Sequence, residues 1–382
     1  MEKKYIFLLL LISTASMPLY SSGSSGEAAA PSTRVVYLSR KSIITRPSEV
    51  YFDSYIASVD YRYPFASEAL GITMYSGHRQ ISTNGQEEVI QIGIQGGKAE
   101  FEDLPPMNLA FVIDRSASMR EANKMRWVKN AFDIFVEKVR DIDFVSLVVF
   151  NGFANVIYPS TQMNSDSKRE EFKDAVRSIR SWGGTNLFSG LQLGYQQVMA
   201  NYREEYINRV LFLTDGIGSA ANMLEMAENY KSIGVNISTI GVGTDFELPL
   251  MQELAKKGGG SSRFISDRET MAEIFGSELD RMVVPSAYNL EMLLRLPYDV
   301  QILGTWGYNS RIKGNTITYS HDTLHNGDYE TILVHLRIPA GQKAGRQTLA
   351  QFSISYDDIN GRNYSSDNHE LEVEYVRIDS PA

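Results

Sequence analysis

The sequence predicts an α/β fold, in which a doubly wound and mostly parallel sheet is inserted between two β-rich flanks. Three observations predict it. Apolar runs of strand length lie between residues 105 and 284, amphipathic helical patterns separate them, and strand-like segments with turn residues fill residues 34–104 and 285–378. We expect the two flanks to form one β-sandwich, because a first flank of about 70 residues would be marginal alone. Two separate small β domains are the alternative.

In the central segment, strand and helix patterns alternate. The apolar runs are uniform enough for strands buried on both faces. They cover residues 109–113, 144–150, 210–213 and 235–242. Three helical stripes lie between them: Val128, Ala131, Phe132, Phe135 and Val139; Phe172, Ala175, Val176 and Ile179; and Leu224, Ala227 and Tyr230. Residues 154–158 follow the second run so closely that the pair should be an antiparallel edge hairpin.

Short runs rich in β-branched and aromatic residues mark the flanks as β structure. The first flank has candidate strands at 35–38, 54–63, 72–75 and 89–94, and the second at 289–296, 316–319, 331–338, 348–356 and 370–375. Tyr61 and Tyr63 are two residues apart, so a strand would place them on one face. Ordinary β propensity explains this tyrosine-rich stretch better than a ligand-stacking role.

The N-terminus predicts export. Lys3 and Lys4 precede an apolar run at residues 5–12, and Ser13-Thr14-Ala15 then fits a cleavage site. We expect a signal peptide over residues 1–20, a flexible linker over residues 21–33, and an extracytoplasmic bacterial protein that is periplasmic, secreted or on the cell surface. The apolar run is far shorter than the roughly 20 residues of a spanning helix. No membrane span is therefore expected after cleavage.

Composition excludes several classes of function. A net charge of −9 without a long Lys/Arg run argues against a nucleic-acid partner. Cysteine is absent from the sequence, which removes disulfides, thiolate metal sites and cysteine nucleophiles. The sequence also has no G-x-S-x-G elbow, H-E-x-x-H helix or phosphate-binding P-loop. We therefore expect a protein that is not an enzyme.

Three separated motifs carry the chemistry. Phe111-Val112-Ile113-Asp114-Arg115-Ser116-Ala117-Ser118-Met119 is an apolar strand that ends in an aspartate and two alternate serines. Trp182-Gly183-Gly184-Thr185-Asn186 and Phe212-Leu213-Thr214-Asp215-Gly216 follow later in the chain. Open α/β sheets bind ligands at the carboxyl ends of their strands, where the first and third motifs fall. Helix caps and a turn are the alternative explanation of each single motif.

Together the motifs resemble the von Willebrand factor type A family and its metal-ion-dependent adhesion site. The resemblance covers about half of the chain, and it implies a divalent-cation site formed by Asp114, Ser116, Ser118, Thr185 and Asp215. Two features depart from the family pattern. Ala117 replaces the commonest glycine of the loop, which matters only if that position needs a positive φ. Arg115 adds a positive charge that either points away or steers acidic ligands.

Carboxylate and hydroxyl oxygens are hard ligands, so this set suits Mg²⁺ or Mn²⁺. Ca²⁺ fits less well, because it takes more ligands. Two carboxylates only balance the divalent charge, which leaves room for an acidic group of a partner. A helix that starts near Met119 would favour such a carboxylate through its positive end. The family is understood to bind its ligands in this way.

Weaker signals have simpler explanations. His321 and His325 have a spacing that some zinc sites use, but we expect a loop at residues 320–326 without a third ligand. Residues 357–361 resemble part of a calcium loop and are better explained as a hairpin turn. Residues 245–247 should start a helix rather than join the metal site. A last helix is expected at residues 269–282, as in relatives that switch between affinity states.

The sequence favours an exported binding or adhesion protein whose metal captures an acidic residue of a protein partner. The alternative is a structural or assembly protein of the bacterial envelope, in which the metal mainly stabilises the α/β domain and the β-sandwich makes the contacts. A metal-dependent hydrolase is a third hypothesis, in which Asp215 or Asp114 acts on a metal-bound water. None of the five histidines lies near the three motifs to serve as its general base.

Overall fold

The structure is a computed structural model. It describes residues 61–64, 69–97, 104–216, 222–243, 246–265, 285–307, 310–358 and 361–377, together with Ile56, Val59 and Ala66. The predicted signal peptide and linker, the first candidate strand and the predicted last helix lie outside these residues. Among the described residues, no helix is both long enough and apolar enough to cross a membrane.

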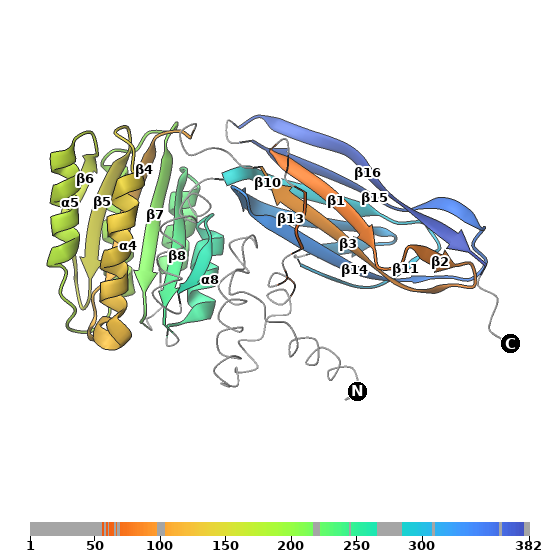
Figure 1. The fold of residues 1–382 in the computed structure, drawn as a ribbon, viewed down its shortest axis with the longest axis horizontal. Coiled ribbons are helices and arrows are strands. Elements are labelled where there is room, and N and C mark those ends of the chain that lie inside the picture. The colour runs from red at the N-terminus through yellow and green to blue at the C-terminus, as the bar shows by residue number, and fades with distance from the viewer. Residues whose placement is uncertain are drawn as a thin grey trace.

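The described residues between 104 and 265 form an α/β unit around a six-stranded sheet (Figure 1). In spatial order its strands are β6 (Ala154–Gln162), β5 (Phe144–Phe150), β4 (Met107–Asp114), β7 (Ile207–Thr214), β8 (Val235–Val242) and β9 (Ser262–Ile265). Neighbouring strands are parallel except β5 and β6, which form the predicted antiparallel edge hairpin. The predicted doubly wound sheet is confirmed.

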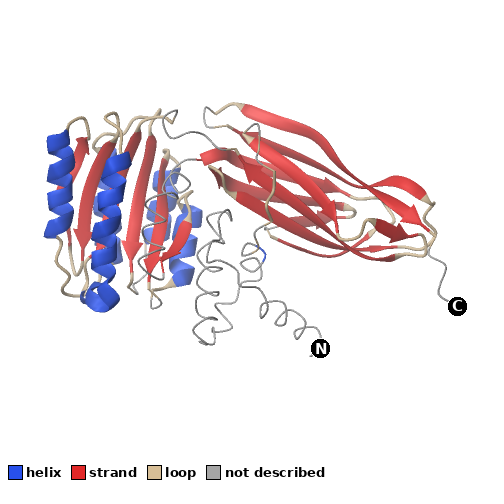
Figure 2. Cartoon of the chain, viewed as in Figure 1, coloured by secondary structure: helices blue, strands red, loops and turns tan. Residues whose placement is uncertain are grey.

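Helices cover both faces of this sheet (Figure 2). One face carries α4 (Lys124–Lys138) and α5 (Asp166–Ser178), and the other carries α6 (Leu187–Met199), α7 (Met223–Lys231) and α8 (Leu248–Lys257). The stripes of α4, α5 and α7 were predicted. Helix α8 begins directly after Glu247, as the helix-start prediction required. Helix α6 was not predicted, because Gly190 and Gly194 in its interior lower its helix propensity.

The order of the strands in the sheet indicates where a ligand can bind. Strand β4 lies between β5 and β7, so the chain winds outward from β4 in both directions. Connections on opposite sides of the sheet separate at such a switch point and leave a crevice at the carboxyl ends of the strands. Asp114 is the last residue of β4, and Asp215 directly follows β7. The two predicted acidic ligands therefore meet at this crevice.

Strands from both flanks form two further sheets. One contains β1 (Leu70–Ser76), β3 (Gln86–Gly96), β14 (Tyr329–Ile338) and β11 (Gln301–Trp306) in that order. The other contains β12 (Ser310–Lys313), β13 (Thr316–His325), β10 (Pro285–Arg295), β15 (Gly345–Asp357), β16 (Asn363–Val376) and β2 (Gln80–Ser82). One hydrophobic core joins the two sheets, and β3 of the first flank pairs with β14 of the second. We call residues 69–97 and 285–377 the β unit.

Three details of the flanks correct or sharpen the predictions. His321 and His325 lie in β13 rather than in a loop, because β13 continues to residue 325 as the partner of β10. Residues 61–64 are not in a strand, although the rings of Tyr61 and Tyr63 do stack on one side, with centroids 5.5 Å apart. Strands β15 and β16 pair antiparallel on either side of the predicted turn at residues 357–361, with Asp357 opposite Asn363, as a hairpin requires.

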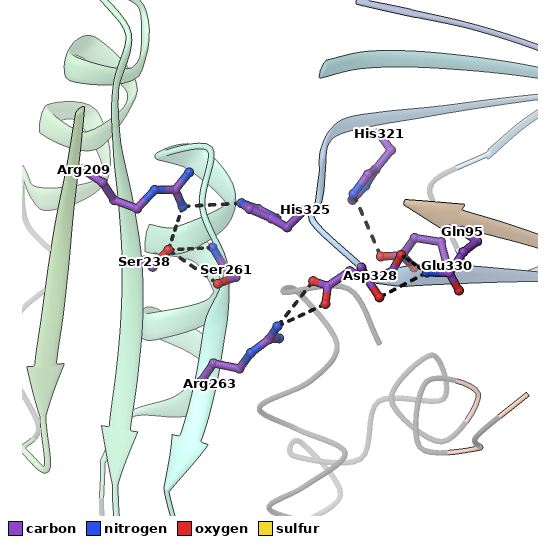
Figure 3. Close-up of polar contacts among 10 residues, drawn as sticks. Gln95, Arg209, Ser238, Ser261, Arg263, His321, His325, Asp328 and Glu330 are labelled. Atoms are coloured by element: carbon purple, nitrogen blue, oxygen red, sulfur yellow. Dashed lines mark hydrogen bonds and ion pairs between the residues drawn. The ribbon is translucent and has the colours of Figure 1, made fainter. Parts of the chain in front are cut away.

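Buried charged groups connect the β unit to the α/β unit (Figure 3). Arg263 of β9 and Asp328, which precedes β14, form an ion pair of 3.3 Å. Arg209 of β7 lies 3.4 Å from Nε2 of His325 and donates a 2.8 Å hydrogen bond to Ser238 of β8. Relative exposure is 5% or less for Arg209, Arg263, His325 and Asp328. The end of the β13–β14 hairpin is therefore fixed against β7, β8 and β9.

Candidate metal site

The loop after β4 is organised around the carboxylate of Asp114. This carboxylate is completely buried, and it accepts hydrogen bonds from the backbone N–H of Ser116 at 2.7 Å and from Oγ1 of Thr214 at 2.6 Å. Burial raises the pKa of Asp114, and the neighbouring Asp215 raises it further, while the hydrogen bonds from Thr214 and Ser116 lower it. The net direction is upward, because few donors replace the lost water.

The two serines link this carboxylate to the second one. Oγ of Ser116 lies 3.0 Å from Oγ of Ser118, which donates to Oδ1 of Asp215 at 2.8 Å. Asp215 is 2% exposed, whereas Ser118 is partly exposed. The chain of oxygens thus runs from the buried end of β4 toward the surface and back to the end of β7.

Thr185 reaches the same place from the loop before α6. A Cβ built on Gly216 would lie 3.3 Å from both Oγ1 of Thr185 and Oδ2 of Asp114, so these two oxygens approach one point. The loop is held in place by hydrogen bonds from the backbone N–H of Ala117 to Gly183 O at 3.1 Å and from Trp182 N–H to Arg115 O at 2.8 Å. The structure therefore brings all five predicted residues together.

The donor set fits a small divalent cation. Two carboxylates and three hydroxyls converge, and all are the hard oxygen ligands that Mg²⁺ and Mn²⁺ prefer. Within the described ranges, no group of three or more His, Cys, Asp or Glu residues is placed to hold a metal. A site built from histidines, including the His321/His325 pair, is thus not formed there, and the hydroxyl-rich set remains the candidate.

The loop differs from the predicted geometry at two points. Ala117 is not among the described residues with positive φ, so alanine fits where the family prefers glycine. The helix does not start near Met119: residues 117–123 form a 3₁₀ segment with non-helical angles at Glu121 and Ala122, and the α-helix begins at Lys124. No α-helix starts near Met119, so the expected attraction of a carboxylate by the positive end of such a helix is not supported.

Lys124 is a site residue that the sequence interpretation missed. Its Nζ lies 2.6 Å from Oδ2 of Asp215, and the side chains are 6% and 0% exposed, respectively. The sequence did contain a signal for it: Lys124 lies one helical turn before Val128 and so extends the apolar stripe of α4. A lysine on a buried face needs an acidic partner. The candidate site therefore already contains a positively charged side chain, the ammonium of Lys124.

An aromatic surface lies next to the site. The guanidinium carbon of Arg115 is 5.5 Å from the ring centroid of Trp182 and 5.8 Å from that of Phe153. Trp182 is 45% exposed and Phe153 49% exposed. Arg115 therefore points away from the two carboxylates, and it forms cation–π contacts that keep its positive charge at the rim of the site.

Comparison with known proteins identifies the α/β unit. A model of the von Willebrand factor type A domain matches residues 108–277. The α/β unit is a von Willebrand factor type A domain. It contains the three motifs of the candidate site, and such domains commonly mediate metal-dependent binding of proteins.

Two relatives align with more residues of this chain than the type A domain model matches. The uncharacterized protein YfbK of Escherichia coli is 28% identical over 273 residues, 68% of this chain and 47% of the relative. The uncharacterized protein sll0103 of Synechocystis is 24% identical over 194 residues, 50% of this chain and 45% of the relative. This chain thus spans about half the length of these relatives.

Among solved structures, a von Willebrand factor type A protein from Catenulispora acidiphila aligns with a TM-score of 0.55 at 15% identity. The alignment covers 83% of this chain and 76% of that one. At this identity the likeness concerns the fold. It extends beyond the type A domain, because residues 108–277 are less than half of the chain.

Proposed function

We propose that this protein is a metal-dependent binding protein that engages an acidic group of a protein partner through Mg²⁺ or Mn²⁺ held by the type A domain. The observation that carries the proposal is the convergence of Asp114, Ser116, Ser118, Thr185 and Asp215 at the switch point of the sheet. A bound cation supplies an electrophilic centre that attracts a carboxylate. Ser118 and Thr185 are partly exposed, so a partner can approach this edge.

The surface beside the site supports a protein partner. Trp182 and Phe153 are large, half-exposed apolar side chains, and the guanidinium of Arg115, which belongs to the metal loop, contacts both rings. Tryptophan and arginine are enriched among the residues that dominate protein–protein binding. A partner that presents a carboxylate next to an apolar side chain would contact the metal and this rim together.

A non-enzymatic role belongs to the same proposal. All five histidines lie in the β unit, at positions 78, 321, 325, 335 and 369, so none can act as a general base at the site. Export to the bacterial envelope or beyond is also proposed, from the signal-like residues 1–20. Metal-dependent turnover of an ester or phosphoester, abolished by Asp114→Ala, would contradict the non-enzymatic role.

Calorimetric titration with Mn²⁺ tests the metal site. The wild type should bind one Mn²⁺ per chain, and Asp114→Ala should lose binding, because the central carboxylate of the ligand network is gone. Asp174→Ala is the matched control, since Asp174 lies in α5 with its side chain 71% exposed. Equal Mn²⁺ affinity of the wild type and Asp114→Ala would remove the proposal.

Partner capture distinguishes binding from a structural use of the metal. Envelope proteins retained by the immobilised wild type in Mg²⁺ should be released by EDTA and should not be retained by Asp114→Ala. Thermal melting in EDTA under the same conditions shows whether the fold survives. Partners that stay bound to a folded, metal-free protein would favour the structural or assembly role instead.

A further inference from the structure

The local chain path directs Lys124 into the metal site. Ala122 and Asn123, at the end of the 3₁₀ segment, have left-handed φ values of 50° and 63°. These two residues separate the 3₁₀ segment from α4, whose first residue, Lys124, is buried at the ends of the strands rather than exposed to solvent. The backbone thus places an ammonium group among the proposed ligands.

The surroundings of Lys124 are shaped to hold it there. Its Nζ donates to Oδ2 of Asp215, the oxygen that Ser118 leaves free by bonding to Oδ1. Gly243, which follows β8, has no side chain to collide with the lysine: a Cβ there would lie 2.7 Å from Cε and 3.1 Å from Nζ of Lys124. The ammonium is therefore enclosed between the ends of β7 and β8.

We propose that Lys124 is an internal counter-ion of Asp215 that opposes the divalent cation and makes binding of the cation and of an acidic ligand mutually dependent. This inference rests on the proposed function and adds a charge that the motif-based ligand set leaves out. Without a metal, the ion pair neutralises Asp215, which would otherwise be a buried unpaired charge.

Counting charges shows how the dependence arises. Two carboxylates and one ammonium leave one negative charge, so a divalent cation turns the site positive. At low solvent exposure this excess charge is poorly screened. A carboxylate from a partner restores neutrality, so each of the two ligands strengthens binding of the other, and by linkage the enhancement is reciprocal.

Calorimetric titration with Mn²⁺, with and without saturating acetate, tests this dependence, with free Mn²⁺ corrected for complexation by acetate. Acetate should strengthen Mn²⁺ binding by the wild type by about tenfold, within the usual range of coupling between sites. Acetamide, the neutral isostere, should have no effect. Lys124→Met should bind Mn²⁺ about tenfold more tightly without acetate and lose most of the acetate effect. Lys138→Met, at the other end of α4, should behave as the wild type.

The outcomes separate two failures. If the wild type shows no Asp114-dependent Mn²⁺ binding, the proposed function fails. If it binds Mn²⁺ through Asp114 but Lys124→Met has the same affinity and acetate effect, only the role of Lys124 is overturned. Lys124→Met should also melt at a lower temperature without metal and recover with Mn²⁺, which replaces the lost cation. If the variant does not fold in either condition, an absence of acetate enhancement in the wild type overturns the inference.

Discussion

The two buried carboxylates of the candidate metal site have different hydrogen-bond and ion-pair partners. Asp114 accepts hydrogen bonds from uncharged donors, Thr214 and the backbone of Ser116. Asp215 accepts one from Ser118 and forms an ion pair with Lys124. Neutral donors compensate a buried negative charge less completely than a cation does, which agrees with the raised pKa of Asp114. Asp114 is thus the carboxylate whose charge a bound cation would stabilise most.

Substitution of Gly243 tests how tightly Lys124 is enclosed. Gly243→Ala should lower the free energy of unfolding by about 2–4 kcal/mol, because it adds a left-handed alanine and a contact with Lys124. Gly314→Ala is the matched control: Gly314 also has positive φ, but a Cβ there meets nothing within 4 Å. This control should lose only about 1–2 kcal/mol. Urea unfolding measures both, and equal losses would show that Lys124 moves aside freely.

The five oxygen-bearing residues could be predicted because their motifs are local in sequence. Lys124 could not be assigned to the site in the same way. Its burial follows from the stripe of α4, but its partner Asp215 lies 91 residues away. A stripe shows which face of a helix is buried and not which side chains of other elements lie opposite it.

Helix α6 holds the metal loop by packing unusually close to the sheet. A Cβ at Gly194 would lie 2.4 Å from Cγ2 of Val112 in β4, and one at Gly190 would lie 2.5 Å from the ring of Phe150 in β5. The same glycines that obscured this helix in the sequence are therefore required by its packing. Thr185 and Asn186 immediately precede α6, so its position fixes theirs.

Gly194→Ala should lower the free energy of unfolding by about 2 kcal/mol, because overpacking outweighs the gain in helix propensity. Val112→Ala removes the methyl group that the new Cβ would meet. The double variant should therefore be less destabilised than the sum of the single variants, with an interaction energy of about 1–2 kcal/mol. Urea unfolding of the four proteins gives this cycle. Strict additivity would mean that α6 shifts without contacting Val112.

At the scale of the whole molecule, the two units meet through buried charges rather than a purely apolar surface. His325 is neutral in this setting: burial lowers its pKa well below the ordinary value, and Arg209, Arg263 and His321 lower it further. A neutral imidazole can accept a hydrogen bond from Arg209, whereas an imidazolium cannot. Protonation of His325 would thus break a contact between the units and add repulsion.

The pH dependence of stability follows from this lowered pKa. The unfolded chain protonates His325 near its ordinary pKa of about 6.5, whereas the folded chain resists protonation, so stability falls as pH decreases below that value. Between about pH 7.5 and about pH 5.5, the free energy of unfolding falls by about 1.4 kcal/mol because of His325. Over the same pH interval, urea unfolding of His325→Gln should show a decrease in the free energy of unfolding that is smaller than that of the wild type by this amount. An equal loss of stability in the wild type and in His325→Gln would contradict this role of His325.

The sequence by itself was enough to predict the fold class and to place the candidate metal site at the carboxyl ends of the strands. Alternating apolar runs and amphipathic stripes predicted the α/β sheet, and the motifs at the ends of β4 and β7 and before α6 predicted the oxygen ligands, because each of these signals lies within a short stretch of sequence. Four strands of only three to six residues, β2, β9, β11 and β12, were not predicted, since they are too short to show a period.

Tertiary structure decided what lies between the elements. The pairing of β3 with β14, the ion pair of Lys124 with Asp215, and the contact of His325 with Arg209 join residues from 91 to more than 200 positions apart. Such contacts depend on which faces and edges come together after folding, and no local pattern records them. The sequence therefore predicted where a cation and an acidic ligand would bind, and only the packed chain revealed that the ammonium of Lys124 lies at the same place.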